Sequence, residues 1–242
     1  MIPENLLVKY GLLEDDAASA IEEAISNVLS RAFKMDVSVH IDVGLEILAL
    51  ARACIGSQDP EPIEIANISR QLKRQIRYQI ERELEKRQSL REWDLLRSMR
   101  GLPIAGEVMK VARDGNVTVA LEVEDHFRSL ILTGTCASRQ IPLKERGLLQ
   151  IGTKRTFLVT SVLPVREKDK SKVLIRLSRT SRALPASLLR ETTGEASIRC
   201  RRRIAGAFSE IETTRRIPKE AIQAVGKELG ERIIVRVVAQ EK

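Results

Sequence analysis

The apolar positions of the first hundred residues predict helices flanking a pair of strands. Apolar side chains recur every three or four positions over 17–34, which indicates an amphipathic helix with Asp15 and Asp16 at its N-cap end. Residues 37–41 alternate between apolar and polar side chains, as a half-buried strand does. Residues 45–55 are ambiguous, because their alanines favour a helix whereas their place after a turn favours a paired strand.

A second, longer helix is expected after a loop. Two prolines mark 57–62 as that loop, and helical periodicity then runs over 63–99, with one candidate break at Gln88–Ser89. Gly101 and Pro103 end the helix. Its charged faces have a plain explanation as solvated surface with pairs four residues apart.

Between 104 and 178 the apolar period changes from about 3.6 to 2. Turn signals such as Gly134 and Gly152 separate short apolar runs. These runs give five strand candidates, namely Ile104–Val108, Val117–Val123, Leu130–Leu132, Phe157–Val159 and Val173–Leu177. Five short strands in this space predict a small five-stranded OB-type β-barrel, which leaves no exposed sheet edge.

The remainder of the chain predicts a small α+β module behind a linker. The linker is expected at 183–194, which contains Pro185 and Gly194. The expected elements are then strand 196–200, strand 208–213, helix 219–229 and strand 232–238.

Charge is distributed unevenly along this pattern. The 242 residues carry a formal net charge of +8, yet residues 1–62 hold four Lys/Arg and eleven Asp/Glu, a net of −7 that leaves +15 for the rest. A basic rear favours a polyanionic partner such as nucleic acid, although plain solubility would also explain it. An acidic front and a basic rear indicate two different partners.

Several classes of function find little support in the sequence. Cys54, Cys136 and Cys200 are far apart and form no CxxC, so neither a disulfide nor a zinc site is expected. No apolar run approaches the length of a membrane span, and no signal segment is evident, so the chain is expected to be cytoplasmic and off the membrane. No nucleotide-binding, metalloprotease or nucleophile motif is present, so we expect neither catalytic residues nor a cofactor or metal.

The order of elements and several short strings resemble the NusA family of transcription elongation and termination factors over nearly the whole chain. The strings that carry the resemblance are His40-Ile41-Asp42, Gly106-Glu107-Val108, Leu177-Ser178-Arg179-Thr180, Ile198-Arg199-Cys200, Gln223-Ala224-Val225 and Glu228-Leu229-Gly230-Glu231-Arg232-Ile233. The resemblance implies an N-terminal RNA-polymerase-docking domain over 1–100, an S-one-type RNA-binding barrel over 101–182 and a degenerate KH-like module over 195–242. It also favours a strand for 45–55.

The KH-like module departs from the family pattern. A KH module clamps the RNA backbone with a GxxG loop. That loop aligns with Arg216-Ile217-Pro218-Lys219, where both glycines are missing, and the short helix expected before it is also missing. Non-specific contact with phosphates is therefore expected in place of sequence reading.

The candidate RNA-contact residues are the cations of the barrel and of the tail, together with one aromatic residue. Guanidinium forks suit phosphate geometry, although a run of charge also protects an exposed strand edge. Phe127 is equally explained by base stacking and by packing. The candidates are Lys110, Arg113, Phe127, Arg128, Lys154, Arg155, Arg176, Arg179, Arg199, Arg201, Arg202, Arg203, Arg215, Arg216 and Lys219. Arg199, Arg201 and Arg203 are expected to share one strand face.

The resulting expectation is a monomeric α+β multidomain protein that binds single-stranded RNA and, as the resemblance implies, RNA polymerase. It would modulate elongation, pausing, termination or antitermination. The alternatives are a polymerase-independent RNA binder, such as a ribosome-associated protein or RNA chaperone, a protein-interaction scaffold, and a nuclease carrying an RNA-binding barrel.

Overall fold

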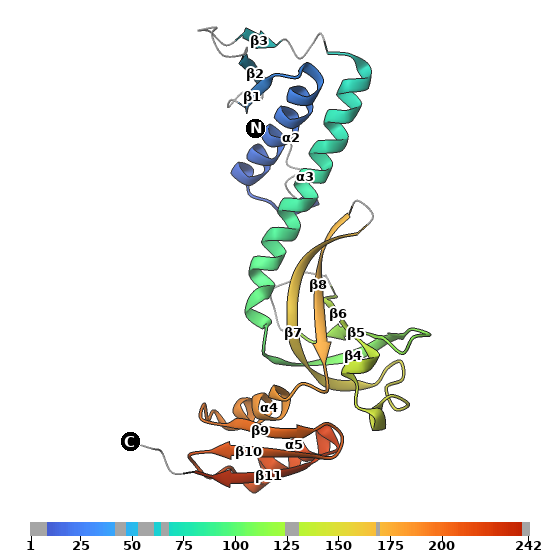
Figure 1. Cartoon of the computed structure of the whole chain (residues 1–242), viewed down its shortest axis with the longest axis vertical. Helices are drawn as coiled ribbons and strands as arrows, with labels where there is room; N and C mark the ends of the chain where they lie inside the picture. The colour runs from blue at the N-terminus through green and yellow to red at the C-terminus, as the bar shows by residue number, and fades with distance from the viewer. Residues whose placement is uncertain are drawn as a thin grey trace. The chain divides into compact units, whose positions relative to one another are not determined.

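The computed structural model describes residues 9–41, 47–52, 61–63, 68–123, 131–167 and 170–238. The chain is an α+β protein, as predicted, with an N-terminal helix, strands and a long helix, then a closed five-stranded sheet and a small three-stranded sheet with helices (Figure 1). It divides into two compact units. Unit 1 comprises Met1–Leu95 and Pro164–Val173, and unit 2 comprises Leu96–Leu163 and Leu174–Lys242.

The first helix of unit 1 confirms the amphipathic pattern. Helix α2 (Glu14–Phe33) buries alanines and aliphatic residues such as Ile25 and Leu29. Asp15 and Asp16 lie inside its first turn, so the expectation that they flank it as caps is wrong, and the N-cap residue is Leu13. Their negative charges still interact favourably with the positive end of the helix dipole.

The strands of unit 1 form an antiparallel sheet in the order β1-β2-β3. Strand β1 (Asp36–Ile41) pairs with β2 (Ile47–Arg52), so the strand interpretation of 45–55 is confirmed over its described part. Strand β3 (Glu61–Ile63) pairs with β2. The loop expected over 57–62 is therefore wrong at its last two positions, and 57–60 lie outside the described residues.

The long helix α3 (Arg70–Leu96) is continuous, so the candidate break at Gln88–Ser89 is wrong, and the helix starts later than position 63. A short 3-10 turn, Arg97–Met99, follows it. Leu84 packs with α2, and Arg87 Nη2 lies 3.1 Å from Glu23 Oε2 on that helix. Among the described residues, the structure contains no helix with the length and apolar character of a membrane span.

The closed sheet, most of which belongs to unit 2, has the strand order β4-β5-β6-β8-β7. Its strands are β4 (Pro103–Val111), β5 (Val117–Leu121), β6 (Thr133–Cys136), β7 (Lys154–Glu167) and β8 (Lys170–Ser178). Strand β4 runs antiparallel to β5 and β7, β5 runs antiparallel to β6, and β6 runs parallel to β8. The five predicted strands therefore exist, but the third lies later than expected.

Gly134 explains the misplaced third strand. The sequence pattern treats it as a turn, whereas it lies in β6 opposite Ile175 of β8. A Cβ at this position would come within 2.6 Å of Leu177 Cδ1, so the close approach of the neighbouring side chain requires a glycine.

The C-terminal module of unit 2 comprises helix α4 (Ala183–Thr193), strands β9 (Arg199–Ile204) and β10 (Phe208–Thr213), helix α5 (Lys219–Leu229) and strand β11 (Arg232–Val237). The sheet order is β11-β10-β9, with β10 antiparallel to β9 and parallel to β11. The predicted limits of β10 and α5 are confirmed, while β9 starts three positions later than expected.

The linker expected over 183–194 is wrong, because this segment is helix α4. Pro185 lies in the first turn, where a backbone N–H has no partner within the helix. Every residue from Leu184 to Leu189 is buried, and the helix packs with Ile211 and Leu229 in the core of the module. Gly194 adopts the left-handed conformation and ends the helix.

Candidate nucleic-acid interface

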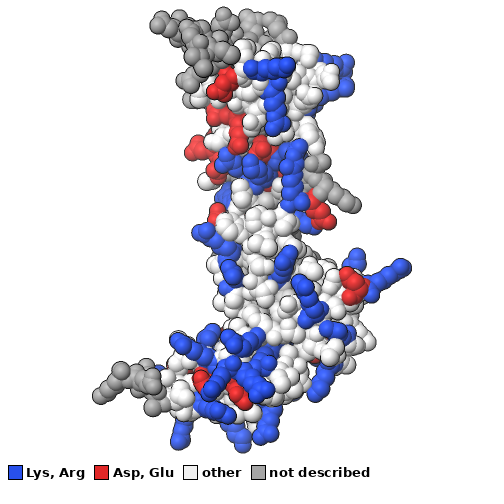
Figure 2. Space-filling view, viewed as in Figure 1, with Lys and Arg blue, Asp and Glu red and all other residues white. Residues whose placement is uncertain are grey.

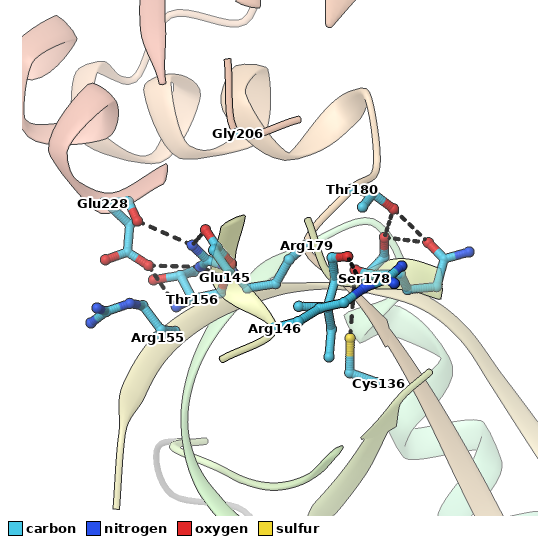
Figure 3. A network of polar contacts seen from close by, with 12 residues as sticks. Cys136, Glu145, Arg146, Arg155, Thr156, Ser178, Arg179, Thr180, Gly206 and Glu228 are labelled. Carbon is cyan, nitrogen blue, oxygen red and sulfur yellow. Dashed lines mark hydrogen bonds and ion pairs between the residues drawn. The ribbon is translucent and has the colours of Figure 1, made fainter. Parts of the chain in front are cut away.

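Arg179, which the resemblance marks as an RNA contact, is completely buried, with an exposed fraction of 0%. Figure 3 shows its guanidinium held between two carboxylates. Nε and Nη2 donate to the two carboxylate oxygens of Glu145 at 2.6 and 2.7 Å, and Nη1 donates to Glu228 Oε1 at 2.9 Å. The remaining donors reach the carbonyl oxygens of Thr156 and Glu228 at 2.7 and 3.1 Å.

This network joins elements that are distant in the sequence. Arg179 follows β8, Glu145 ends a 3-10 turn, Thr156 lies on β7 and Glu228 lies on α5. Burial alone would lower the pKa of the Arg179 guanidinium, but hydrogen bonds and charge from Glu145 and Glu228 outweigh it and raise that pKa. Arg179 therefore connects the closed sheet to the C-terminal module, and its prediction as an RNA contact is wrong.

Arg203 is also buried, with 2% of its side chain exposed. Its guanidinium makes a two-point contact with Glu231, with Nη2 at 2.7 Å and Nε at 3.2 Å from Oε1. Glu231 also accepts hydrogen bonds from the Gly206 N–H at 2.8 Å and the Ser209 hydroxyl at 2.7 Å. Burial by itself would raise the pKa of Glu231, but these donors lower it below its usual range.

Alternation along the strand predicts that Arg203 shares a face with Arg199 and Arg201. A β-bulge explains why it does not. Cys200 pairs with Ile211 and Arg202 pairs with Glu210, so Arg201 is left out of the register. The extra residue reverses the alternation beyond it. Arg203 consequently points to the side covered by helices, and its prediction as an RNA contact is wrong.

The other described candidates are exposed on unit 2, although three of them form ion pairs. Lys154 Nζ lies 2.7 Å from Glu122 Oε1, Arg201 Nη1 lies 3.0 Å from Glu212 Oε1, and Arg215 Nη1 lies 3.5 Å from Glu195 Oε2. Within the described ranges, the following candidates are exposed and make no ion pair: Lys110, Arg113, Arg155, Arg176, Arg199, Arg202, Arg216 and Lys219. Phe127 and Arg128 lie outside the described residues.

No helix directly precedes the segment Arg216–Lys219, which aligns with the GxxG loop. Strand β10 ends at Thr213 and α5 begins at Lys219, and the residues between them form a turn and extended chain. Thr213 Oγ1 donates to the Arg215 carbonyl at 3.0 Å and fixes the start of this segment. Arg216 and Lys219 are exposed there, so the segment can attract phosphates although it cannot clamp them.

A hollow of about 390 Å³ on the closed sheet is lined by two arginines, one of them a predicted RNA contact. Arg139 and Arg176 contribute to its wall, and both side chains are exposed. The hydroxyl-bearing residues Thr135, Thr160 and Ser161 also line it, and its described lining contains no carboxylate. Such a wall offers only hydrogen-bond donors and neutral groups to an anion.

Sequence reasoning missed several exposed arginines of unit 2, including Arg139, Arg232 and Arg236. The last two lie four residues apart on β11, so alternation along the predicted strand already placed them on one face. Figure 2 shows the outcome, because Lys and Arg side chains gather over the C-terminal module and outnumber the Asp and Glu side chains visible among them.

Metal-holding clusters and reactive cysteines were the remaining features to place in the described part of the chain. No group of three or more His, Cys, Asp or Glu residues suited to hold a metal ion occurs there. Burial raises the pKa of the Cys136 thiol to about 12, so this cysteine stays protonated at neutral pH. Cys200 is half-buried, and Cys54 lies outside the described residues.

In comparisons with known proteins, no family model matches the chain and no curated protein matches it significantly.

Proposed function

We propose that this chain is a NusA-like RNA-binding transcription factor that docks on RNA polymerase and contacts nascent RNA to modulate elongation, pausing, termination or antitermination. The observation that carries the RNA part is the charge of the surface of unit 2. Exposed Lys and Arg without described carboxylate partners lie on both of its sheets, and such a surface binds polyanions by releasing their counterions.

The topology of unit 2 supports the same reading. A closed five-stranded sheet whose third and fifth strands run parallel agrees with an OB-type barrel of the S-one kind. A three-stranded sheet with one parallel pair, covered by α4 and α5, agrees with a degenerate KH-like module. Both types of module bind single-stranded RNA.

The polymerase part rests on the resemblance of the front of the chain and on its negative charge. A protein that only binds RNA has no use for a front segment with a net charge of −7. We assign no cofactor, metal or catalytic residue to the chain.

Two measurements on the full chain test the proposal. Titration with unstructured single-stranded RNA at two salt concentrations should give an affinity that falls steeply with salt, because phosphate contacts dominate. No measurable affinity would reject RNA binding and favour a protein-interaction scaffold. Affinity capture from a bacterial lysate should recover core RNA polymerase, whereas recovery of ribosomes without polymerase would favour the polymerase-independent alternative.

A further inference from the structure

The sheet of the C-terminal module has one face that its helices leave uncovered. The core formed by α4 and α5 takes side chains from one side of the sheet, including Cys200, Ile211 and Val235. Residues that alternate with these point the other way and are exposed or half-buried. We call this second side the arginine face, and it comprises Arg199, Arg201, Arg202, Ile204, Phe208, Glu210, Glu212, Arg232, Ile234 and Arg236.

The strand register arranges these side chains in three rows across the sheet. One row contains Ile204, Phe208 and Arg232, the next contains Arg202, Glu210 and Ile234, and the last contains Arg199, Glu212 and Arg236. The bulge adds Arg201 at the edge, where its guanidinium reaches Glu212. The irregularity that buries Arg203 thus places neighbouring arginines on the open side.

The charge of the arginine face exceeds what its own acids can neutralise. Five arginines share this face with only Glu210 and Glu212. Glu212 already accepts a hydrogen bond from Arg201 and also lies in register between Arg199 and Arg236. A net charge of +3 therefore remains on one side of a small sheet, and it is complementary to a phosphate backbone.

An aromatic ring lies among these charges. Phe208 is half-buried on the central strand, and the Arg202 guanidinium carbon lies 5.6 Å from the centre of its ring. Aromatic rings and guanidinium planes are the surfaces on which unpaired bases stack. An acidic protein would be attracted by the arginines alone, whereas unpaired bases joined by phosphates use both the arginines and the ring of Phe208, and a duplex keeps its bases inside.

We infer that the arginine face binds a single-stranded stretch of RNA, with phosphates on Arg199, Arg202, Arg232 and Arg236 and one base stacked on Phe208. The inference deepens the proposed function and rests on it. This site needs no glycine loop, so it gives the C-terminal module a way to hold RNA without the clamp that the segment Arg216–Lys219 lacks.

The test compares variants of the full chain that change charge or stacking while keeping size. Arg202→Gln with Arg236→Gln should make the slope of log affinity against log salt less negative by about 1.4, since each lost phosphate contact contributes about 0.7 for single strands. Arg77→Gln, which removes a charge from an exposed position of α3 in unit 1, is the control and should leave the slope unchanged.

Stacking is tested separately with Phe208→Leu and two probes of equal length and charge, an oligonucleotide with bases and an abasic one. The variant should bind the first roughly fivefold more weakly, which corresponds to the loss of one stacked base, and the abasic probe as the parent does. Equal losses for both probes, or a parent that binds a duplex as tightly as the single strand, would overturn the assignment.

These outcomes separate the two proposals. If the parent binds RNA and the arginine-face variants bind equally well, RNA lies elsewhere on unit 2, so the inference fails while the proposed function stands. If those variants lose polymerase capture while RNA binding is unchanged, the face docks a protein, and the inference also fails. If the parent binds no RNA, both fail. Thermal melting of each variant shows that the fold is retained.

Discussion

Arginines of identical chemistry have opposite roles in unit 2, and only their neighbours distinguish them. Arg179 and Arg203 are held inside by Glu145, Glu228 and Glu231, whereas Arg202 is exposed one residue from Arg203. The partners of the buried pair lie 34, 49 and 28 positions away in the sequence. A local pattern of charges cannot show such pairing, so burial of these arginines was not predictable.

Replacing Arg179 tests its structural role. Arg179→Met should lower the free energy of unfolding by about 3 kcal/mol, the low end for breaking a buried ion pair, because 30% of the Glu228 side chain is exposed. Urea denaturation measures this change. The control is Arg155→Met, at the exposed position next to Thr156, which should change the free energy of unfolding by less than about 0.5 kcal/mol. A loss no larger than that of the control would contradict the role.

The Arg203–Glu231 pair predicts a pH dependence of stability. Because Arg203, Ser209 and Gly206 hold the pKa of Glu231 below its usual range against the effect of burial, the charged form stabilises the fold. This contribution is present above the unfolded pKa of about 4.3 and is lost as pH falls through the folded value. The advantage of the parent over Glu231→Gln, followed by urea denaturation, should therefore shrink below about pH 4. A constant difference down to pH 2 would refute it.

The Cys136 thiol should be unreactive while the protein is folded. Its burial raises its pKa to about 12, and the thiolate is the form that reacts. Mass spectrometry of the peptide that contains Cys136 after iodoacetamide treatment should show little alkylation at pH 8 and complete alkylation in urea. Rapid labelling without urea would mean that the closed sheet opens.

At the level of elements, periodicity predicted those with one polar face and failed where that contrast is absent. The limits of β10 and α5 were predictable because apolar residues recur at clear intervals of two and of three or four. The limits of helix α4 were not predictable, because six consecutive residues, Leu184–Leu189, are buried and include Pro185, so its apolar residues show no helical spacing. The position of strand β6 was not predictable, because a glycine such as Gly134 usually indicates a turn. Here the glycine is needed because the side chain of Leu177 lies too close for a Cβ.

Helix α4 provides a direct check of this correction. Leu189 has an exposed fraction of 0% and lies in the core of the C-terminal module. Leu189→Ala should lower the free energy of unfolding by about 2–5 kcal/mol through the cavity it leaves, as urea denaturation would measure. Glu191→Ala, which changes an exposed position of the same helix, should have an effect below about 0.5 kcal/mol. If both substitutions had equal and small effects on the free energy of unfolding, the interpretation of 183–194 as a linker would be favoured instead.

At the level of the whole molecule, charge is segregated along the chain and not only balanced overall. The acidic front belongs to unit 1, and the exposed arginines of both sheets belong to unit 2. The composition made an anionic partner predictable, but not which face receives it. The arginine face depends on β11 lying parallel to β10, a pairing that no local pattern indicates. The three-domain boundaries at 100, 182 and 195 stay a prediction.

Lysine footprinting tests this segregation. Excess single-stranded RNA should slow acetylation of Lys110 and Lys219, which are exposed on unit 2, because bound phosphates shield their ammonium groups. Lys34, exposed at the end of α2 in unit 1, is the internal reference and should react at an unchanged rate. If RNA protected Lys34 and not Lys110 or Lys219, RNA would bind unit 1, which would contradict the proposal.

The contact between Arg179 and Glu228 also makes the closed sheet sensitive to events near the end of the chain. During synthesis, β8 leaves the ribosome before α5 does. Until α5 has folded, Glu145 is the one carboxylate of this network that Arg179 can bind. A premature stop before position 228 would leave Arg179 with this single carboxylate partner permanently, and the damage would appear as a loosened sheet far upstream of the missing residues.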